Sequence, residues 1–405
     1  MRIHAYRALR PVPDLAARIA SVPYDVVNTA EARALADGNP LSMLRVKRAE
    51  IEFPEGTDPY SPAVYARAKT NFQKLIDAKH LVREERPCVY VYRQEAGTHK
   101  QTGVAALCHA EDYECGLIKR HEKTRKDKED DRTRLTDTLS ANPGPVFLTY
   151  RDQPAIDAAV AAITREDPLF NFRAPDGVRH TVWRVSEPAS LVEAFKSVTC
   201  MYIADGHHRA ASAARVARDR KSKNPRHTGN EDYNWFLNVM FPASQLQILP
   251  YNRLVADLHG RTVDGFLADL AKVGKVAPHG SPSPVAPGHV SVFLAGQWHD
   301  LELHVPADAD PVSRLDVSVL QDRVLAPLLG IDDPRTNHRI DFVGGIRGTG
   351  FLEEAVKAGR AAVAFSLHPV TITQLMDIAD AGQIMPPKST WFEPKLRSGL
   401  FMHTF

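Results

Sequence analysis

Residues 199–220 have the sequence TCMYIADGHHRAASAARVARDR, and this stretch predicts a strand, a sharp turn and a helix in direct succession. The apolar run 199–204 is typical of a short buried strand that ends at a turn signal. Gly206 follows at the point where the chain must turn, and glycine adopts backbone conformations that other residues avoid. The alanine-rich run 209–220 has the composition of a helix. We therefore expect the fold to be organised around this strand–turn–helix unit.

Strand-like and helix-like segments alternate through the rest of the N-terminal half. The predicted strands are 88–93, 102–110, 146–150 and 181–185, and the predicted helices are 62–80, 154–165 and 188–196. The first two strands are joined by a loop that contains Gly97, so they predict a β-hairpin. Because strands and helices interleave, the predicted fold class is α/β with a mixed sheet of the α+β kind.

The chain is long enough for several domains, and the sequence predicts three parts. Residues 1–250 are expected to form the core that carries the site. Residues 251–345 are expected to form a separate α+β subdomain, because a helix-like run at 263–273 is followed by a hairpin pattern and a second helix-like run at 314–331. Residues 346–405 are expected to return to the first core.

The charge balance limits the partners of this protein. Its 405 residues contain 51 Lys and Arg against 49 Asp and Glu, a formal net charge of +2. Binding to nucleic-acid phosphates needs a clear excess of cations, so no nucleic-acid partner is expected. No run of about 18 apolar residues is present, which predicts no membrane span. The N-terminus lacks the apolar stretch of a secretory signal.

The 4 cysteines are scattered and have no paired spacing, which favours reduced thiols and a cytoplasmic location. The sequence is compatible with a homo-oligomer and does not decide the oligomeric state.

The first candidate site is the turn between the predicted strand and helix. The first backbone amides of a helix have no partner inside the helix, and Gly206 lets an anion approach them. His207, His208 and Arg209 add donors that suit phosphate oxygens. Asp205 is a candidate ligand for Mg²⁺ or an acceptor for a hydroxyl proton, although an aspartate here is also a common helix cap. Zinc is less favoured, because adjacent histidines do not have the usual ligand spacing on a helix.

The second candidate site is the charged segment that begins at Ile118. A phosphoryl-transfer site needs cations, carboxylates and a group that positions the nucleophile, and this segment has all three. Its composition alone favours a solvated helix face. The candidates are Arg120, His121, Glu122, Lys123, Thr124 and Arg132.

The third candidate is Lys388-Ser389-Thr390, which is similar to the end of a phosphate-binding Walker loop. The GxxxxG that such a loop requires is absent before it, so a standard nucleotide loop is excluded here. A structured proline-rich loop is an equal alternative. No GxSxG is present, which disfavours a serine hydrolase.

Several segments of this chain together resemble one family. The segments that carry the resemblance are SVPYDVV (21–27), NPLSML (39–44), IKRHEKT (118–124), DDRTRL (130–135), ANPGPVFLTY (141–150), YIADGHHRAASAA (202–214) and MPPKSTWFEPKLRSGL (385–400). They are similar to a bacterial and archaeal family long known only as a conserved domain of unknown function, whose members include pyrophosphate-dependent kinases of free L-serine. The DGHHR element also resembles the phosphate-binding turn of the ParB/sulfiredoxin-like fold.

The resemblance implies a ParB/sulfiredoxin-like core and the transfer of a phosphoryl group to L-serine, giving O-phospho-L-serine with Mg²⁺ and with pyrophosphate, ATP or ADP as donor. It implies that His207, His208, Arg209 and the Gly206 amide hold the donor phosphates, and that Glu122 or Asp205 is the general base. Further phosphate contacts are expected at Arg120, His121, Lys123, Thr124, Arg132, Lys388, Ser389 and Thr390. The alternatives are a ParB-like module that binds nucleotide or DNA without kinase activity, and a phosphatase or nucleotide hydrolase that uses the same site.

Overall fold

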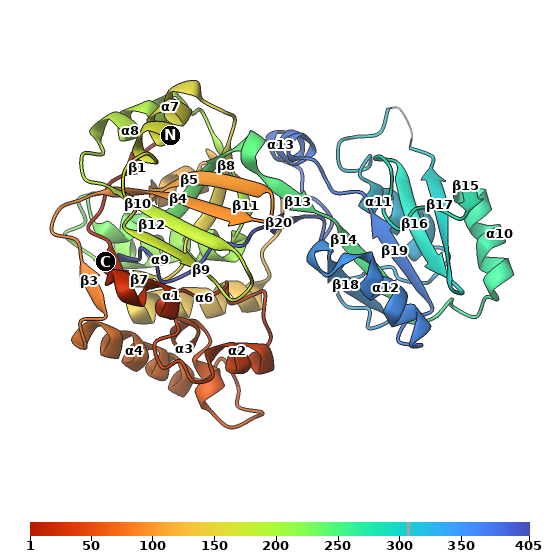
Figure 1. Cartoon of the computed structure of the whole chain (residues 1–405), viewed down its shortest axis with the longest axis horizontal. Coiled ribbons are helices and arrows are strands. Elements are labelled where there is room, and N and C mark those ends of the chain that lie inside the picture. Colours follow the sequence, from red (N-terminus) through yellow and green to blue (C-terminus); the bar gives the residue numbers. More distant parts are fainter. Residues whose placement is uncertain (306–307) are drawn as a thin grey trace. The chain divides into compact units, whose positions relative to one another are not determined.

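The computed structural model describes residues 1–305 and 308–405, which form two compact units. The first unit comprises residues 1–246 and 394–405, and the second comprises residues 247–393. Figure 1 shows the elements of both units, coloured along the sequence. The chain therefore leaves the first unit at Leu246 and re-enters it at Pro394.

The first unit contains strands and helices in alternation. Its strands are β1 (Ile3–His4), β2 (Leu9–Pro11), β3 (Leu81–Arg83), β4 (Val89–Ala96), β5 (His99–His109), β6 (Ile118–Lys119), β7 (Ala141–Asn142), β8 (Val146–Tyr150), β9 (Phe170–Arg173), β10 (Arg179–Val185), β11 (Met201–Asp205), β12 (Trp235–Pro242) and β21 (His403–Thr404). Its α-helices are α1 (Ala16–Ile19), α2 (Thr29–Ala36), α3 (Leu44–Lys47), α4 (Pro62–Asp77), α5 (Ala110–Glu114), α6 (Lys126–Leu139), α7 (Pro154–Ile163), α8 (Ala189–Ala194) and α9 (His207–Lys223).

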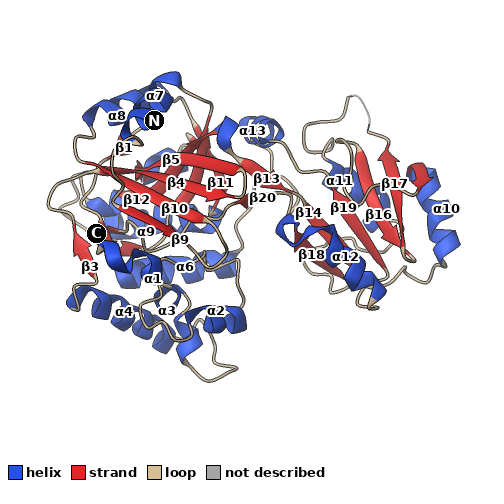
Figure 2. Ribbon diagram, viewed as in Figure 1, coloured by secondary structure: helices blue, strands red, loops and turns tan. Residues whose placement is uncertain are grey.

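The first unit is built on a nine-stranded sheet with the order β6-β11-β8-β12-β5-β4-β10-β9, and β1 pairs with β5 beside this path. β12 runs parallel to β8 and β6 runs parallel to β11, whereas the other pairs in this sheet are antiparallel. The mixed sheet and its interleaved helices confirm the predicted α/β class (Figure 2). The ParB/sulfiredoxin-like core stays a prediction.

The two faces of this sheet are covered differently. Alternate residues of the strands point to one face, since side chains along a strand alternate, and there they pack against α7, α8 and the alanines of α9. On the other face the C-terminal segment covers the sheet, because Phe401 stacks on Tyr90 and meets Tyr92 edge-on, with ring centroids 5.5 Å apart in both pairs. A second core lies between α3, α4 and α6.

The second unit has its own sheet and core. Its elements are β13 (Gln247–Leu249), β14 (Tyr251–Val255), α10 (Val263–Val273), β15 (Gly274–Pro278), β16 (His289–Leu294), β17 (Gln297–Leu303), α11 (Asp316–Leu320), β18 (Ile340–Gly344), α12 (Gly348–Lys357), β19 (Val363–Leu367), α13 (Ile372–Asp380) and β20 (Trp391–Glu393). Six strands form an antiparallel sheet in the order β15-β17-β16-β19-β14-β18, and α12 packs on it through Leu352 and Ala355.

The expected return of residues 346–405 to the first core needs correction. β19 lies between β16 and β14 in the middle of the second sheet, and all of its side chains are buried. Only residues 394–405 belong to the first unit. A short apolar strand that is buried on both faces looks the same in either core, so its sequence does not say which sheet it joins.

Within residues 1–305 and 308–405, no helix is long and apolar enough to cross a membrane.

Candidate functional site

The junction between β11 and α9 is held by a glycine in a conformation that other residues avoid. Gly206 has φ +97°, in the left-handed region, and it stands between the last residue of β11 and the first of α9. A Cβ at this position would lie 2.9 Å from the guanidinium of Arg209. Both the backbone and the close approach of Arg209 therefore require glycine here.

Asp205 is enclosed by cations. The Arg209 Nη2 donates to its Oδ2 at 2.8 Å, and the Lys395 Nζ lies 3.5 Å from its Oδ1. Burial alone would raise the pKa of Asp205, but the charges of Lys395 and Arg209 outweigh burial and hold this pKa well below its ordinary value. The carboxylate is ionised at neutral pH, and both of its oxygens face positive charge.

This environment does not fit the predicted magnesium ligand. Mg²⁺ prefers carboxylate oxygens that it shares with water or phosphate, and at Asp205 it would stand beside two cations. The residues present therefore assign Asp205 to the ion pairs with Arg209 and Lys395.

Three cations line a hollow beside this junction, and we call Lys47, Arg132 and Arg209 the cationic pocket. Its wall is completed by Tyr24, Gly144 and a set of mostly apolar side chains. Arg132 is buried, with its guanidinium carbon 4.0 Å from the centre of the Tyr24 ring. The pocket therefore combines fixed positive charge with exclusion of water, which strengthens the attraction of an anion.

Arg132 and Arg209 are already held in place by neighbouring groups. Arg132 donates through its Nε to Asp131 at 2.9 Å, and its Nη1 donates to the backbone carbonyl of Lys47 at 3.3 Å. Arg209 also donates through its Nη1 to the backbone carbonyl of Pro145. These bonds fix both guanidinium groups before a ligand arrives.

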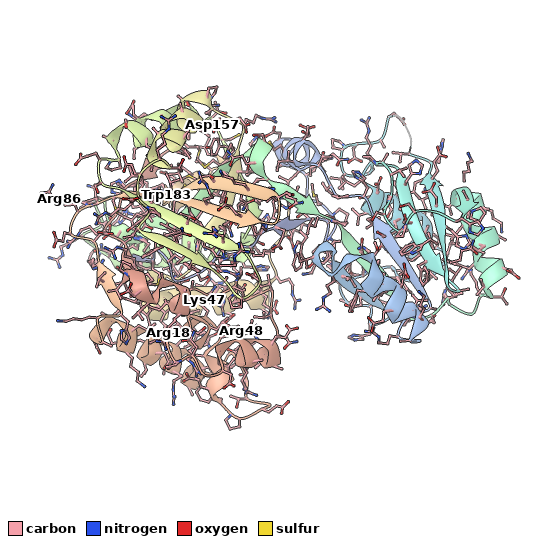
Figure 3. All side chains as sticks on the ribbon, viewed as in Figure 1. Arg18, Lys47, Arg48, Arg86, Asp157 and Trp183 are labelled. Carbon is pink, nitrogen blue, oxygen red and sulfur yellow. The ribbon has the colours of Figure 1, made fainter. Side chains whose placement is uncertain are left out.

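Lys47 is the residue of the pocket whose surroundings most disfavour a positive charge. Its Nζ donates to the hydroxyl of Ser398, and its side chain is labelled in Figure 3. Burial lowers the pKa of Lys47 well below its ordinary value, and the charges of Arg209 and Arg132 lower it further. The charged form of Lys47 would gain from a bound anion.

The charges around the pocket do not balance. Lys47, Arg132, Arg209 and Lys395 face the buried Asp131 and the partly buried Asp205. The exposed carboxylate of Asp25 adds a negative charge from the solvent side. The excess of one positive charge depends on a protonated Lys47, which a bound anion would favour, and this makes the pocket the candidate anion site of the first unit.

His208 has a partner within the protein at one of its two ring nitrogens, and its role as a phosphate donor stays a prediction. Its Nε2 accepts a hydrogen bond from the backbone amide of Arg125 at 3.0 Å, so this nitrogen carries no proton. Burial lowers the pKa of His208, which favours the same neutral form. The imidazole therefore holds the loop between β6 and α6 against α9.

The other candidates of the charged segment lie outside the pocket, apart from Arg132. Arg120 is exposed and stands over the Tyr113 ring at 5.1 Å, Lys123 is exposed, and the Thr124 hydroxyl donates to Glu129 at 2.8 Å.

His121 and His207 are buried together behind the junction. Their rings are perpendicular with centroids 4.5 Å apart, and the Nδ1 of His207 lies 3.8 Å from Glu122 Oε2. Burial lowers the pKa of His121 to about 4, and burial together with His121 lowers that of His207 well below its ordinary value. Both histidines are neutral near pH 7, and neither lines the cationic pocket.

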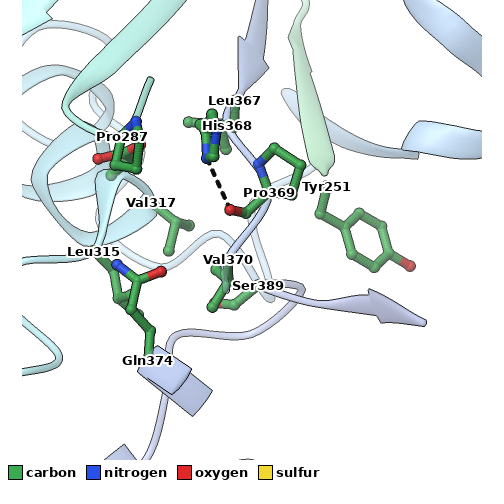
Figure 4. A pocket seen from close by; sticks show the side chains of 11 residues that line it. Tyr251, Pro287, Leu315, Val317, Leu367, His368, Pro369, Val370, Gln374 and Ser389 are labelled. Carbon is green, nitrogen blue, oxygen red and sulfur yellow. Dashed lines mark hydrogen bonds between the residues drawn. The ribbon is translucent and has the colours of Figure 1, made fainter. Parts of the chain in front are cut away.

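Lys388, Ser389 and Thr390 belong to the second unit. Ser389 lines a hollow that Figure 4 shows from close by, and its hydroxyl already donates to the Pro386 carbonyl at 2.6 Å. The 11 residues that line this hollow include no lysine or arginine. Lys388 instead stands over the Tyr251 ring at 5.4 Å. This hollow lacks the charge that a phosphate needs.

Sequence reasoning missed Lys47 and Lys395. Each lies in or beside a segment that carries the family resemblance, since Lys47 follows NPLSML and Lys395 lies within MPPKSTWFEPKLRSGL. Neither lysine belongs to a local chemical motif, so only their positions in the fold identify them.

Comparison with known proteins gives one family. The family described as "Protein of unknown function (DUF1015)" matches residues 3–318. No curated protein matches the chain.

Three solved structures are similar to the chain at low identity. A conserved hypothetical protein from Pyrococcus furiosus is 10% identical, with coverage of 73% of this chain and 94% of that chain and a TM-score of 0.37. A free serine kinase in complex with AMP is 11% identical, with coverage of 73% and 91% and a TM-score of 0.37. SbnI with a C-terminal truncation from Staphylococcus aureus is 11% identical, with coverage of 73% and 86% and a TM-score of 0.40. Likeness at this level carries no argument about the activity of this chain.

Proposed function

The chain belongs to the DUF1015 family, and from the cationic pocket of this member we propose that it is a small-molecule kinase. The proposed reaction is transfer of a phosphoryl group to the hydroxyl of free L-serine, giving O-phospho-L-serine. The observation that carries the proposal is the group of four cations, with too few carboxylates to balance them, at the N-terminus of α9. The acceptor comes from the family resemblance of the segments around this pocket.

The donor phosphates would lie in the cationic pocket. Arg209, Arg132 and Lys47 supply charge-assisted donors, which form the strongest hydrogen bonds to phosphate oxygens. The first turn of α9 adds unpaired backbone amides and the positive end of the helix dipole. We propose pyrophosphate as the donor, because it carries no base or ribose and needs only such groups. ATP and ADP are the alternative donors.

Asp205 is the carboxylate that we assign to the serine hydroxyl. It lies beside the cations that would hold the transferring group, at 2.8 Å from Arg209, whereas Glu122 faces His207. Its low pKa makes it a weak base, which suffices because the transition state of phosphoryl transfer is loose and needs little proton removal beforehand. The serine oxygen forms the new bond to phosphorus, the bridging P–O bond of pyrophosphate breaks and releases inorganic phosphate, and the hydroxyl proton passes to Asp205.

Magnesium enters this proposal as part of the substrate. Mg²⁺ binds phosphate oxygens readily, and in many phosphoryl-transfer sites one or two carboxylates complete its shell. Here it would arrive on the donor phosphates, because the positive charges of Arg209 and Lys395 beside Asp205 repel a further cation, although they leave the carboxylate able to accept from a hydroxyl.

The test is a screen of donors against acceptors. The purified protein is incubated with Mg²⁺ and with pyrophosphate, ATP or ADP, with and without L-serine, and phosphoserine is detected by mass spectrometry. We expect phosphoserine from at least one donor, and a fall of more than about tenfold in Arg209→Lys, because lysine cannot form the two-pronged contact of arginine. The matched control is Lys100→Met, at an exposed position in the β4–β5 hairpin.

The other outcomes identify the alternatives. Release of phosphate that does not depend on serine would make the protein a phosphatase or nucleotide hydrolase. Absence of any product, together with salt-dependent retention on DNA, would favour the ParB-like binding module.

A further inference from the structure

Two histidines and a glutamate meet behind the β11–α9 junction. His121 and Glu122 follow β6, and His207 is the first residue of α9, directly after β11 and Gly206. β6 pairs parallel with β11, so the carboxyl ends of both strands lie at the same edge of the sheet. The pairing of these two strands brings the three side chains together.

These three side chains offer one ligand atom each, and the atoms lie within 4.8 Å of one another. Ligands about 2.0–2.2 Å from a metal ion stand about 3–3.5 Å apart, so a shift of roughly 1 Å would close the set. Glu122 can make this shift, because its side chain is 41% exposed. The exposed side also leaves a route by which an ion can enter.

The second observation is the lack of hydrogen bonds at the buried imidazoles. His121 is only 2% exposed, and neither of its ring nitrogens makes a well-aligned hydrogen bond, although the Ile203 backbone lies close enough to favour its protonated form. His207 is 5% exposed, and its Nε2 also has no partner. A buried polar atom without a good partner costs on the order of 1–3 kcal/mol, so such atoms in two adjacent rings need a physical reason.

We propose that His121, Glu122 and His207 form a binding site for a divalent transition-metal ion. Two imidazoles and one carboxylate suit Zn²⁺, Mn²⁺, Fe²⁺ or Co²⁺, whereas Mg²⁺ prefers oxygen ligands alone. The proposal rests on the geometry of these three residues and not on the proposed kinase reaction.

The ion would act on the neighbouring turn. His207 precedes Arg209 by two residues and follows Gly206 directly, so an ion bound to His207 ties the start of α9 to the end of β6. His121, Glu122 and His207 are then positioning residues for the cationic pocket. This role also removes Glu122 from the candidates for the general base.

The sequence could not show this site. The spacing between His207 and His208 on α9 argues against zinc, but the second histidine of the set is His121. His208 is bonded to the amide of Arg125 instead.

The experiment uses Co²⁺ as the probe ion, because Co²⁺ bound to imidazole has visible absorption bands that depend on its ligands. The full-length protein is freed of metal with a chelator and titrated with Co²⁺ in the absence of substrates. We expect visible bands that saturate at one ion per chain, are abolished by Zn²⁺ and persist in millimolar Mg²⁺. No saturable bands, or equal displacement by Mg²⁺, would overturn the proposal.

Glu122→Gln tests the ligand set with little risk to folding, because this side chain is partly exposed and the substitution keeps its shape. We expect the affinity for Co²⁺ to fall at least about tenfold. Glu231→Gln is the matched control, since Glu231 pairs with His227 at 2.9 Å with no third ligand among the groups found in the described residues. Unchanged affinity in Glu122→Gln, or an equal loss in Glu231→Gln, would contradict the assignment. Because no substrate is present, failure here is distinct from failure of the kinase proposal.

Discussion

The Nζ of Lys47 donates a hydrogen bond to the hydroxyl of Ser398, and both side chains are buried although 351 residues separate them. Ser398 is held in place by backbone bonds to Ser21 in both directions. The C-terminal segment, which also supplies Lys395, therefore holds the Lys47 side chain from outside the lining of the cationic pocket. The contacts that hold Lys47 and Asp205 form only after the chain has returned from the second unit.

Lys47→Met should separate anion binding from stability. Methionine has a similar length and fits irregular cores, and it removes a buried charge that Arg209 and Arg132 repel. We expect the free energy of unfolding to stay equal or rise by about 1 kcal/mol. We expect catalysis to fall by at least about tenfold and the rise in Tm on adding pyrophosphate to disappear. Lys100→Met should change none of these quantities, and a parent-like Tm shift in Lys47→Met would show that Lys47 does not face the anion.

Gly144→Ala should destabilise the protein through the same contact. A Cβ at residue 144 would collide with the Ser398 hydroxyl and stand 3.4 Å from the Lys47 Nζ. Overpacking of this kind costs about 1–3 kcal/mol. Ser398→Ala removes the colliding oxygen, so the double variant should lose less than the sum of the two single losses, by about 0.5 kcal/mol or more. Urea unfolding of the parent, the two single variants and the double variant measures these losses of stability. Strictly additive losses would argue against the collision.

The strand–turn–helix unit could be predicted from the sequence because its signals are local. An apolar run, a glycine and an alanine-rich run suffice to place β11, the left-handed Gly206 and α9. The hairpin was predicted too, but β4 and β5 extend further than their apolar runs. Gln94 and Gln101 are fully buried in this extension and hydrogen-bond to each other at 3.0 Å. Because these residues are polar, their sequence does not indicate that the strands continue through them.

The site could be predicted only in part, for a similar reason. Arg209 and Asp205 belong to one short motif. Lys47, in contrast, is held by a hydrogen bond to Ser398, and Lys395 is held by an ion pair with Asp205. Such contacts join segments that are distant in the sequence, and no spacing rule connects them. The bond from the Arg125 amide to the His208 Nε2 is another contact that a sequence motif does not specify, and the donor role of His208 stays a prediction.

His208→Gln should behave like the parent, and His208→Ala should not. The Gln side-chain oxygen can occupy the place of the His208 Nε2 and accept from the Arg125 amide, whereas alanine cannot. We expect His208→Ala to lose about 1 kcal/mol of stability and the protection of the Arg125 amide from hydrogen exchange. His208→Gln should keep both, together with most of the activity. If His208→Gln keeps the protected amide but loses activity as alanine does, the imidazole itself contacts the substrate.

His403 should make the first unit sensitive to acid. It is 2% exposed, it hydrogen-bonds through its Nε2 to the Asp232 carbonyl at 2.9 Å, and burial lowers its pKa to about 4. In the unfolded chain a histidine has a pKa of about 6.5, so between these two values the unfolded state binds the extra proton. The free energy of unfolding must therefore fall as the pH drops from about 6.5 towards 4. From this residue alone the loss at about pH 5 is roughly 2 kcal/mol.

His403→Gln tests this dependence, because glutamine can donate to the Asp232 carbonyl but does not titrate. At about pH 8 the histidine is neutral in both the folded and the unfolded chain. The stabilities of the variant and the parent should then differ only by the constant effect of the substitution. On going from about pH 8 to 5 in urea unfolding, the variant should lose roughly 2 kcal/mol less than the parent. A residual loss remains expected, since His121, His180 and His207 are also buried with lowered pKa values. An identical pH dependence in variant and parent would mean that His403 is protonated in the folded protein as readily as in the unfolded chain.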